Sequence, residues 1–286
     1  MAKDTLFRKK RFINFGGKLL DIAEPKVMGI LNVTPDSFYD GGFYESKEAI
    51  KKRVNELLTE GAAFIDVGAC SSRPGAKAVS EEEELSRLDR ALGVIRKHFP
   101  DIIVSVDTYR ASIAGRVVRE YQVDMINDIS AGMLDPEMFN TIADLQVPYI
   151  IMHMPGDPGT MQQKTDYKDL LQNVTEFLAK RKKELSLLGV NDVLIDPGFG
   201  FGKTLDQNFK LLNQLEAFQI LEVPVVVGIS RKSMIHKLLG IKPEEALNGT
   251  TALHMMALER GVDILRVHDV KEAVEVVRLY CKTVRT

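Results

Sequence analysis

The residues with the clearest chemical potential lie in LIDPGFGFGK, residues 194–203, where an apolar run ends on Asp196 and opens into glycines and phenylalanines. An ionised carboxylate accepts two parallel N–H bonds. Glycine lets a ligand approach the backbone closely because it has no Cβ, and phenylalanine offers a flat apolar face. This combination suits a flat heterocycle with paired N–H donors, so the segment predicts a binding pocket rather than a spacer.

Three other apolar runs also end on Asn or Asp, in GILNVTPDSF (29–38), VSVDTYR (104–110) and MINDISAG (125–132). The polar residues predicted at strand ends are Asn32, Arg73, Asp107, Asn127, His153, Asp196, Lys232, Arg266 and His268. Taken singly, such residues are also common helix caps and turn formers, and Asn127-Asp128 could form an Asx turn. Their shared position favours a common site, because chance would scatter them over both ends of a sheet.

Short apolar runs alternate along the chain with longer amphipathic segments, and these elements must position the polar residues. Strands are predicted at 27–32, 63–67, 102–106, 123–127, 148–152, 192–196, 223–228 and 263–267. Helices are predicted near 46–60, 80–98, 109–121, 135–145, 168–188, 205–217, 244–260 and 270–283. Several strands are apolar throughout, as expected when both faces of a parallel sheet are covered.

This alternation predicts an α/β fold with parallel strands. About eight strand-helix units in roughly 260 residues match a (β/α)8 TIM barrel, and a doubly wound sheet is the alternative. Residues 11–22, RFINFGGKLLDI, predict a β-hairpin that turns at Gly16-Gly17 and closes one end of the barrel. Since no linker interrupts the sequence, residues 1–286 are predicted to form a single domain. In a TIM barrel, the chemistry lies where strands end and loops to the helices begin.

Composition argues against several classes of partner. The chain is 45% hydrophobic and 27% charged, and its net charge is −2 with both signs interspersed, so we expect no nucleic-acid partner. We expect no membrane partner, because no apolar run approaches the roughly 20 residues that span a bilayer. The start lacks the apolar core of a signal peptide, which predicts a cytoplasmic location. Cys70 and Cys281 form neither a disulfide framework nor a zinc motif.

Taken together, a set of motifs resembles the dihydropteroate synthase family. The motifs, in the family's order, are NVTPDSF (32–38), SSRPGA (71–76), SVDTYR (105–110), NDISAG (127–132), MHMPGDPGTMQ (152–162), DPGFGFGK (196–203), SRKSM (230–234) and RVHDV (266–270). The resemblance implies a TIM barrel that forms a homodimer. It also implies a transferase that condenses hydroxymethyl-dihydropterin pyrophosphate with p-aminobenzoate, releases pyrophosphate and is a target of sulfonamides.

The resemblance further implies a role for each motif residue. In the pterin pocket, Asp196 would bind the 2-amino edge, Asn127 the adjoining donor and acceptor, and Asp107 the reduced-ring side. Lys232 would reach the carbonyl oxygen, and Met152 and Phe201 would form the apolar walls. The residues implied in catalysis are Lys232, Arg266, His268, Asp107, Asp40 and Arg73.

Pyrophosphate and p-aminobenzoate would occupy neighbouring parts of the same site. By the resemblance, Asn32, Arg266 and His268 cradle the pyrophosphate, with the cofactor Mg²⁺ at Asn32 and Asp40 on the first loop. The residues implied around p-aminobenzoate are Ser72, Arg73 and Pro74 on the second loop, and Ser233 near its carboxylate.

The second loop departs from the family pattern Gly-Glu-Ser-Thr-Arg-Pro, because the chain reads Gly68-Ala69-Cys70-Ser71-Ser72-Arg73-Pro74. We expect Cys70 to be a small buried filler rather than a reactive thiol. Two other functions are open: a pterin-binding methyltransferase domain that holds methyltetrahydrofolate, and a non-catalytic pterin-binding or scaffold protein. SRKSM, RVHDV and SSRPGA argue against the first, and Asn32, Arg266 and His268 argue against the second.

Overall fold

The fold is known from a computed structural model, which describes residues 10–34, 46–70 and 79–284. The strands are β1 (Phe12–Phe15), β2 (Lys18–Asp21), β3 (Lys26–Asn32), β4 (Phe64–Gly68), β5 (Val104–Asp107), β6 (Met125–Asp128), β7 (Tyr149–Met152), β8 (Val193–Asp196), β9 (Val226–Val227) and β10 (Ile264–Val267). The α-helices are α1 (Lys47–Thr59), α2 (Glu81–His98), α3 (Ala111–Tyr121), α4 (Met138–Leu145), α5 (Leu170–Leu187), α6 (Leu205–Asn213), α7 (Ser233–Leu239), α8 (Leu247–Glu259) and α9 (Val270–Val284). The described residues also form three short 3₁₀ helices, η2 (Met161–Gln163), η3 (Leu215–Leu221) and η4 (Pro243–Glu245).

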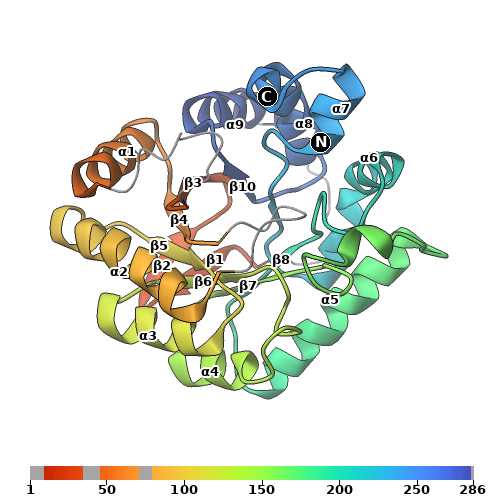
Figure 1. The fold of residues 1–286 in the computed structure, drawn as a ribbon. Coiled ribbons are helices and arrows are strands. Elements are labelled where there is room, and N and C mark those ends of the chain that lie inside the picture. Colours follow the sequence, from red (N-terminus) through yellow and green to blue (C-terminus); the bar gives the residue numbers. More distant parts are fainter. Residues whose placement is uncertain (1–9, 35–45, 71–78, 285–286) are drawn as a thin grey trace.

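The parallel strands form one barrel, in the order β8-β7-β6-β5-β4-β3-β10-β9. A bridge between Ile195 and Val225 brings the two edge strands together, and the helices surround the strands as an outer ring (Figure 1). The predicted TIM barrel is therefore confirmed, and the alternative of a doubly wound sheet is wrong.

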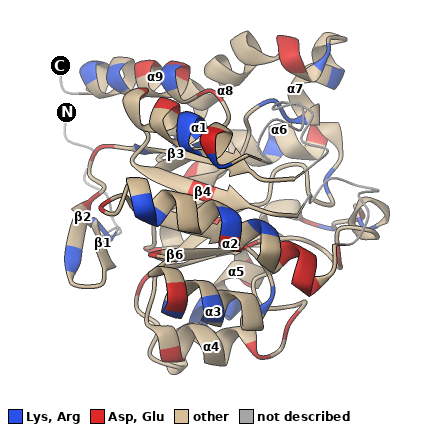
Figure 2. Ribbon diagram, turned by 60° about the vertical axis from the view of Figure 1, so that its left-hand side comes forward, with Lys and Arg blue, Asp and Glu red and all other residues tan. Residues whose placement is uncertain are grey.

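The helices begin and end where local chemistry dictates. Ser80 caps α2 by accepting a hydrogen bond from the backbone N–H of Glu83, and Thr204 and Gln207 form a capping box at the start of α6. Four glutamates occupy the first turn of α2, and three basic residues occupy its last, which complements the helix dipole. Acidic and basic residues alternate over the outer helices in Figure 2.

The N-terminal hairpin of β1 and β2 is present as predicted. Ile13, Phe15 and Ile22 pack against the inward-facing side chains at the amino ends of the barrel strands, including Met28 and Phe64. Figure 2 shows the hairpin at one end of the barrel. The hairpin therefore closes the amino end of the barrel, which leaves the carboxyl ends of the strands for the site.

The predicted elements differ most from the structure in three places. Helix α7 was not predicted, the helix predicted at 205–217 ends at Asn213 and is followed by η3, and the strand predicted at 223–228 is reduced to Val226–Val227. The other strands lie within two residues of their predicted bounds. Among the described ranges, no helix combines the length and the apolar character needed to cross a bilayer.

Candidate active site

Four inward-facing residues form a row across neighbouring strands at the carboxyl end of the barrel. The strand register pairs Asn32 with Gly68, Gly68 with Asp107, and Asp107 with Asn127. A Cβ on Gly68 would lie 3.1 Å from Asn32 Oδ1 and 3.8 Å from Asp107 Cβ, so the glycine gives the two polar side chains room. The structure thus brings together three of the predicted site residues.

Arg266 reaches this row from a deeper level, because its strand position pairs with Met28 rather than with Asn32. Its Nε donates to Asp66 Oδ2 at 2.6 Å and its Nη2 to Asp107 Oδ2 at 2.9 Å. Asp66 Oδ2 also accepts from Asn127 Nδ2 at 3.1 Å. Two carboxylates therefore hold one guanidinium at the mouth of the barrel.

Asp66 was not predicted as a site residue. It lies inside the apolar run AFIDV rather than after it, and strand ends were the signal that we used. A charged residue inside a strand that is otherwise fully apolar is itself a signal, because an ionised carboxylate is expensive to bury.

Burial changes the acidity of the carboxyl groups around the mouth. Removal from water raises the pKa of Asp107 to about 7, against the opposing influence of Arg266. Burial also raises the pKa of Asp196, and the positive charge of Lys232 opposes this rise. Shifted pKa values of this kind are common at active sites.

The loop after β8 is held rigidly by its own polar contacts. Asp196 Oδ1 accepts from the N–H of Gly198 at 2.7 Å, so the structural reading of Asp196 as a turn former is also correct. Gly198 has φ of 75°, and a Cβ there would lie 2.0 Å from the carbonyl oxygen of His153. Lys203 Nζ donates to the carbonyl oxygens of Gly198 at 2.8 Å and Phe201 at 3.0 Å, and it lies 3.0 Å from His153 Nδ1.

Lys203 and His153 therefore serve the loop rather than face its opening. Asn208 completes the arrangement, since its Oδ1 accepts from the N–H of Gly200 at 2.7 Å. Burial lowers the pKa of Lys203 to about 7 and that of His153 to about 3. His153, which the sequence placed among the polar residues at strand ends, thus has a structural role here.

Lys232 follows the neighbouring strand β9 and lies against this loop. Its Nζ donates to the carbonyl oxygen of Phe199 and lies 4.4 Å from the centre of the Phe201 ring. Burial lowers the pKa of Lys232 to about 8, and the negative charge of Asp196 opposes this change. The structure thus brings Asp196, Phe201 and Lys232 together at one corner of the barrel mouth.

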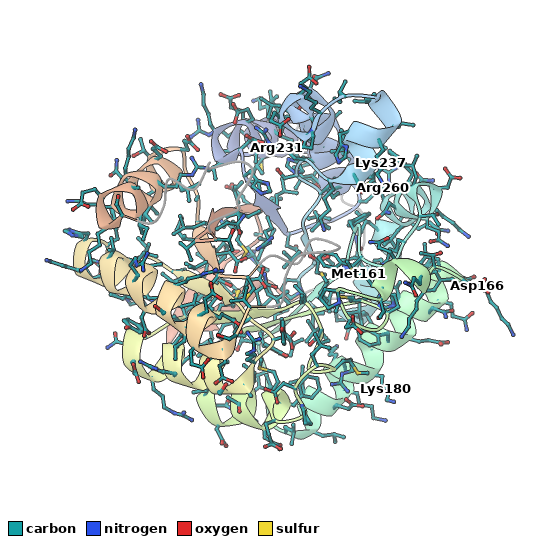
Figure 3. The ribbon with its side chains drawn as sticks, viewed as in Figure 1. Met161, Asp166, Lys180, Arg231, Lys237 and Arg260 are labelled. Atoms are coloured by element: carbon teal, nitrogen blue, oxygen red, sulfur yellow. The ribbon has the colours of Figure 1, made fainter. Side chains whose placement is uncertain are left out.

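An apolar wall borders this corner. Met152 pairs in register with Asp196 and packs in a small cluster with Ile129, Met154 and Met161, against which Phe201 also packs. Met161 lies close to the centre of the barrel in Figure 3, whereas the other labelled residues lie nearer the rim. The sulfur-containing and aromatic side chains offer the flat apolar surface that a heterocycle needs.

His268 lies just beyond β10, beside the loop that carries Lys232. Its Nδ1 is 3.2 Å from Ser230 Oγ, and its carbonyl oxygen accepts from Arg53 Nη2 at 2.9 Å. Ser230 thus orients the histidine, and this contact makes Ser230 a loop residue with a structural role. Ser233, half-buried, begins α7 directly after Lys232.

Other polar residues of the motifs are structural. Asp128 accepts hydrogen bonds from the backbone of Ser130 and Gly132 and from the hydroxyl of Tyr149, which confirms the Asx-turn reading for this residue. Cys70 is a free thiol that is half-buried rather than fully buried, and burial raises its pKa to about 11, which argues against a reactive thiolate. The predicted site residues Asp40, Ser72, Arg73 and Pro74 lie outside the described residues.

Asn32 fits a magnesium site that is completed by a substrate. In the described ranges, no group of three or more His, Cys, Asp or Glu side chains could hold a metal ion. Mg²⁺ prefers oxygen ligands and often takes only one or two from the protein, with substrate phosphates and water as the others. The amide oxygen of Asn32, beside Asp107 at the open end of the barrel, suits that arrangement.

Fold and site together define a TIM-barrel enzyme whose polar groups gather at the carboxyl ends of its strands. The family model described as "Pterin binding enzyme" matches residues 28–268. The chain belongs to this family, and it is a transferase, as its relatives indicate.

The relatives match over nearly their whole length. The dihydropteroate synthase of Escherichia coli strain K12 is 42% identical over 92% of this chain and 93% of its own, and that of Synechocystis is 41% identical over 88% of each. Among solved structures, the Yersinia pestis dihydropteroate synthase in complex with a sulfonamide drug has a TM-score of 0.92 at 38% identity and covers 96% of this chain and 100% of its own. The Xanthomonas albilineans enzyme with 4-aminobenzoic acid has a TM-score of 0.87 at 38% identity and covers 96% of this chain and 99% of its own.

Proposed function

We propose that this chain is a dihydropteroate synthase that joins 6-hydroxymethyl-7,8-dihydropterin pyrophosphate to p-aminobenzoate, giving 7,8-dihydropteroate and pyrophosphate. The observation that carries this proposal is the meeting of two kinds of group at one barrel mouth. Asp196, Asn127 and Lys232 suit the polar edge of a pterin, and Arg266, held by Asp66 and Asp107, suits a diphosphate. The relatives at about 40% identity support the same activity.

The pterin would lie between the apolar wall and the loop after β8. Asp196 would accept the paired N–H groups of the 2-amino edge, since a carboxylate is well suited to two parallel bonds. Lys232, already over the Phe201 ring, would donate to the carbonyl oxygen of the heterocycle. Met152 would contact the ring face from the neighbouring strand.

Departure of pyrophosphate is the step to assist, because an aromatic amine is a weak nucleophile. The bond between the pterin methylene carbon and the pyrophosphate oxygen breaks first, and its electron pair leaves with the oxygen. The amine nitrogen then forms the new C–N bond and loses a proton. Arg266 and His268 would stabilise the charge that grows on the leaving group, and Asp107 and Asp196 would stabilise positive character on the pterin.

We also propose that Asn32 would hold Mg²⁺, which would neutralise charge on the leaving group when bound. The residues Ser72, Arg73, Pro74 and Ser233 are proposed to bind p-aminobenzoate, and Asp40 to act from the first loop. Removal of Mg²⁺ with EDTA should abolish turnover, and re-addition should restore it; normal turnover after EDTA treatment would refute the role of the ion.

The decisive assay mixes the purified chain with Mg²⁺, the pterin pyrophosphate and p-aminobenzoate, and measures pyrophosphate release. Release that requires p-aminobenzoate supports the synthase. A pterin-binding methyltransferase would bind methyltetrahydrofolate and release no pyrophosphate, and a scaffold protein would bind pterin without turnover.

Arg73→Ala should raise the KM for p-aminobenzoate and leave pterin affinity unchanged. An equal loss of pterin affinity would contradict the assignment of the second loop to the p-aminobenzoate site.

Order of binding gives a further test. If pyrophosphate leaves early, p-aminobenzoate should bind tightly only when pyrophosphate occupies the site. Calorimetry should therefore show weak binding of p-aminobenzoate to the free protein and tighter binding in the presence of pyrophosphate and Mg²⁺. Equal affinity in both experiments would contradict early departure.

Three finer features are also proposals. We propose that the chain forms a homodimer. Exposed apolar side chains on α7 and α8, such as Leu238, Leu239 and Met256, offer a surface for it, and analytical ultracentrifugation would measure the oligomeric state.

We also propose that the enzyme is cytoplasmic, which cell fractionation would test. The Yersinia pestis complex suggests that sulfonamides compete here with p-aminobenzoate, which inhibition kinetics would test.

A further inference from the structure

We propose that Asp66, in the middle of β4, is a positioning residue that orients both Arg266 and Asn127 for their substrate contacts. The inference rests on the roles proposed above for those two residues. Asp66 is fully buried, and a single oxygen, Oδ2, accepts from Arg266 Nε at 2.6 Å and from Asn127 Nδ2 at 3.1 Å. One carboxylate therefore links the diphosphate cradle to the pterin pocket.

The contacts to Arg266 fix which of its donors face the substrate. A guanidinium carries five N–H groups in one plane. The Nε–H points to Asp66 and one Nη2–H to Asp107, which sets the orientation of that plane. Among the described residues, these two donors contact carboxylates, which leaves the other N–H groups for an anionic leaving group. Loss of Asp66 would let the plane rotate.

The contact to Asn127 fixes the orientation of its amide. An ionised carboxylate only accepts hydrogen bonds, so the group of Asn127 that faces Asp66 must be Nδ2. The amide oxygen is then turned away from Asp66, together with the second N–H. Asp66 thus decides which edge of Asn127 offers an acceptor to the heterocycle and which offers a donor.

The energetic cost of Asp66 argues against a purely structural role. Its Oδ1 is buried without a hydrogen-bond partner among the described residues, and so is Oγ of Ser105, its neighbour in register on β5. A buried carboxylate with an unpaired oxygen is destabilising compared with an apolar residue of similar size. Stability alone would favour an apolar side chain here, as at the inward positions of Met28 and Met125.

The test compares Asp66→Asn with the matched control Ser105→Ala, which changes a polar group at the same depth of the barrel. Asp66→Asn should weaken the affinity for pterin pyrophosphate by roughly tenfold to a hundredfold, because the charged oxygen that Arg266 and Asn127 share is replaced by a neutral amide that can also turn its N–H groups toward them. Ser105→Ala should bind like the wild type. Circular dichroism checks that both variants are folded, and if Asp66→Asn does not fold, the smaller Asp66→Ser replaces it.

A double-mutant cycle distinguishes positioning from general loosening. If Asp66 acts through its two partners, Asp66→Asn should cost less affinity in an Arg266→Lys or Asn127→Ala background than in the wild type, and little in a background that carries both changes. Additive losses would overturn the inference, and so would wild-type affinity in Asp66→Asn. If instead Arg266→Lys and Asn127→Ala themselves bind pterin pyrophosphate normally, the proposed substrate contacts of Arg266 and Asn127 are wrong. This outcome differs from one in which those contacts hold and only the positioning role of Asp66 is wrong.

The pH profile supplies a readout that loosened packing would not change in this direction. Asp107 faces the charges of Arg266, Asp66, Asp128 and Lys232, and the negative charge of Asp66 is one of those that raise its pKa, after burial itself. The acid limb of kcat/KM should therefore move to lower pH in Asp66→Asn. An unmoved acid limb would contradict direct coupling between Asp66 and the site.

Discussion

The two ends of the barrel interior are built by the same strands, yet charged groups gather at only one of them. At the amino end, Phe64, Met125, Leu194 and Ile264 pack with the hairpin in one apolar cluster. Two residues further along each strand stand Asp66, Asn127, Asp196 and Arg266. Because side chains alternate across a strand with a period of two, each pair faces the interior, one about 6.6 Å above the other.

This spacing shows how the fold separates stability from function. The amino end is closed by the hairpin, and its buried apolar side chains stabilise the fold. The carboxyl end keeps charged groups, whose burial costs free energy. A change at the lower residue of a pair should therefore affect unfolding, and a change at the upper residue should affect substrate binding.

The largest expected effect is at the sealed end. Phe15→Ala removes a buried ring whose centre lies 5.9 Å from that of Phe64, and it should lower the free energy of unfolding by about 3 to 5 kcal/mol. Urea denaturation measures this change. Phe12→Ala, on the exposed face of the same strand, should change the free energy by only about 0.5 kcal/mol. If folded Phe15→Ala lost pterin affinity, the two ends would not be independent.

At the open end, Asp196→Asn should produce the next largest effect. The carboxylate becomes an amide with one acceptor and one donor, and the donor would face a donor of the pterin. Affinity should fall roughly a hundredfold or more, from one or two lost charge-assisted bonds. Calorimetry measures the affinity, and thermal unfolding should show no loss of stability. Pterin binding like that of the wild type would remove Asp196 from the pocket.

At the open end, the sequence was sufficient to predict those polar residues that directly follow an apolar run. Asn127 and Asp196 follow such runs, and strand order then places them at one mouth. Asp66 escaped prediction because its role depends on Arg266, which is 200 residues away in the sequence. Its neighbours in space are set by strand register, which the local pattern does not reveal.

The remaining differences have similar causes. Helix α7 spans only Ser233–Leu239, too short for a clear helical period to appear. In the sequence, Lys203 is only the last residue of a glycine-rich loop. In the structure, its ammonium group holds that loop through hydrogen bonds to the carbonyl oxygens of Gly198 and Phe201. Such roles arise from tertiary contacts that a local pattern does not encode.

A smaller effect should appear in the pH dependence of the open end. The pKa of Asp107 is raised to about 7 and that of Lys232 is lowered to about 8. If the carboxylate and the ammonium are the active forms, kcat/KM should fall about tenfold per pH unit below the first value and above the second. Lys232→Arg should move the basic limb to much higher pH, since arginine keeps its charge. A flat profile from about pH 6 to about pH 9 would contradict these assignments.

The smallest expected effect tests the two ends of a single strand. Asp192 lies just before β8 and Asp196 at its end, and Asp192 Oδ1 accepts from Lys10 Nζ at 2.8 Å and from the N–H of Asn14 at 3.1 Å. Asp192→Asn should therefore loosen the hairpin and lower the free energy of unfolding by about 1 kcal/mol, less at high salt. Denaturation at two salt concentrations measures this, with Asp21→Asn as the control, because the Arg11–Asp21 pair is internal to the hairpin and more exposed. Pterin affinity should be unchanged, since Asp192 is at the end of the strand away from the site. A loss of affinity comparable to that of Asp196→Asn would mean that the hairpin controls the site through β8, and the separation of the two ends would have to be abandoned.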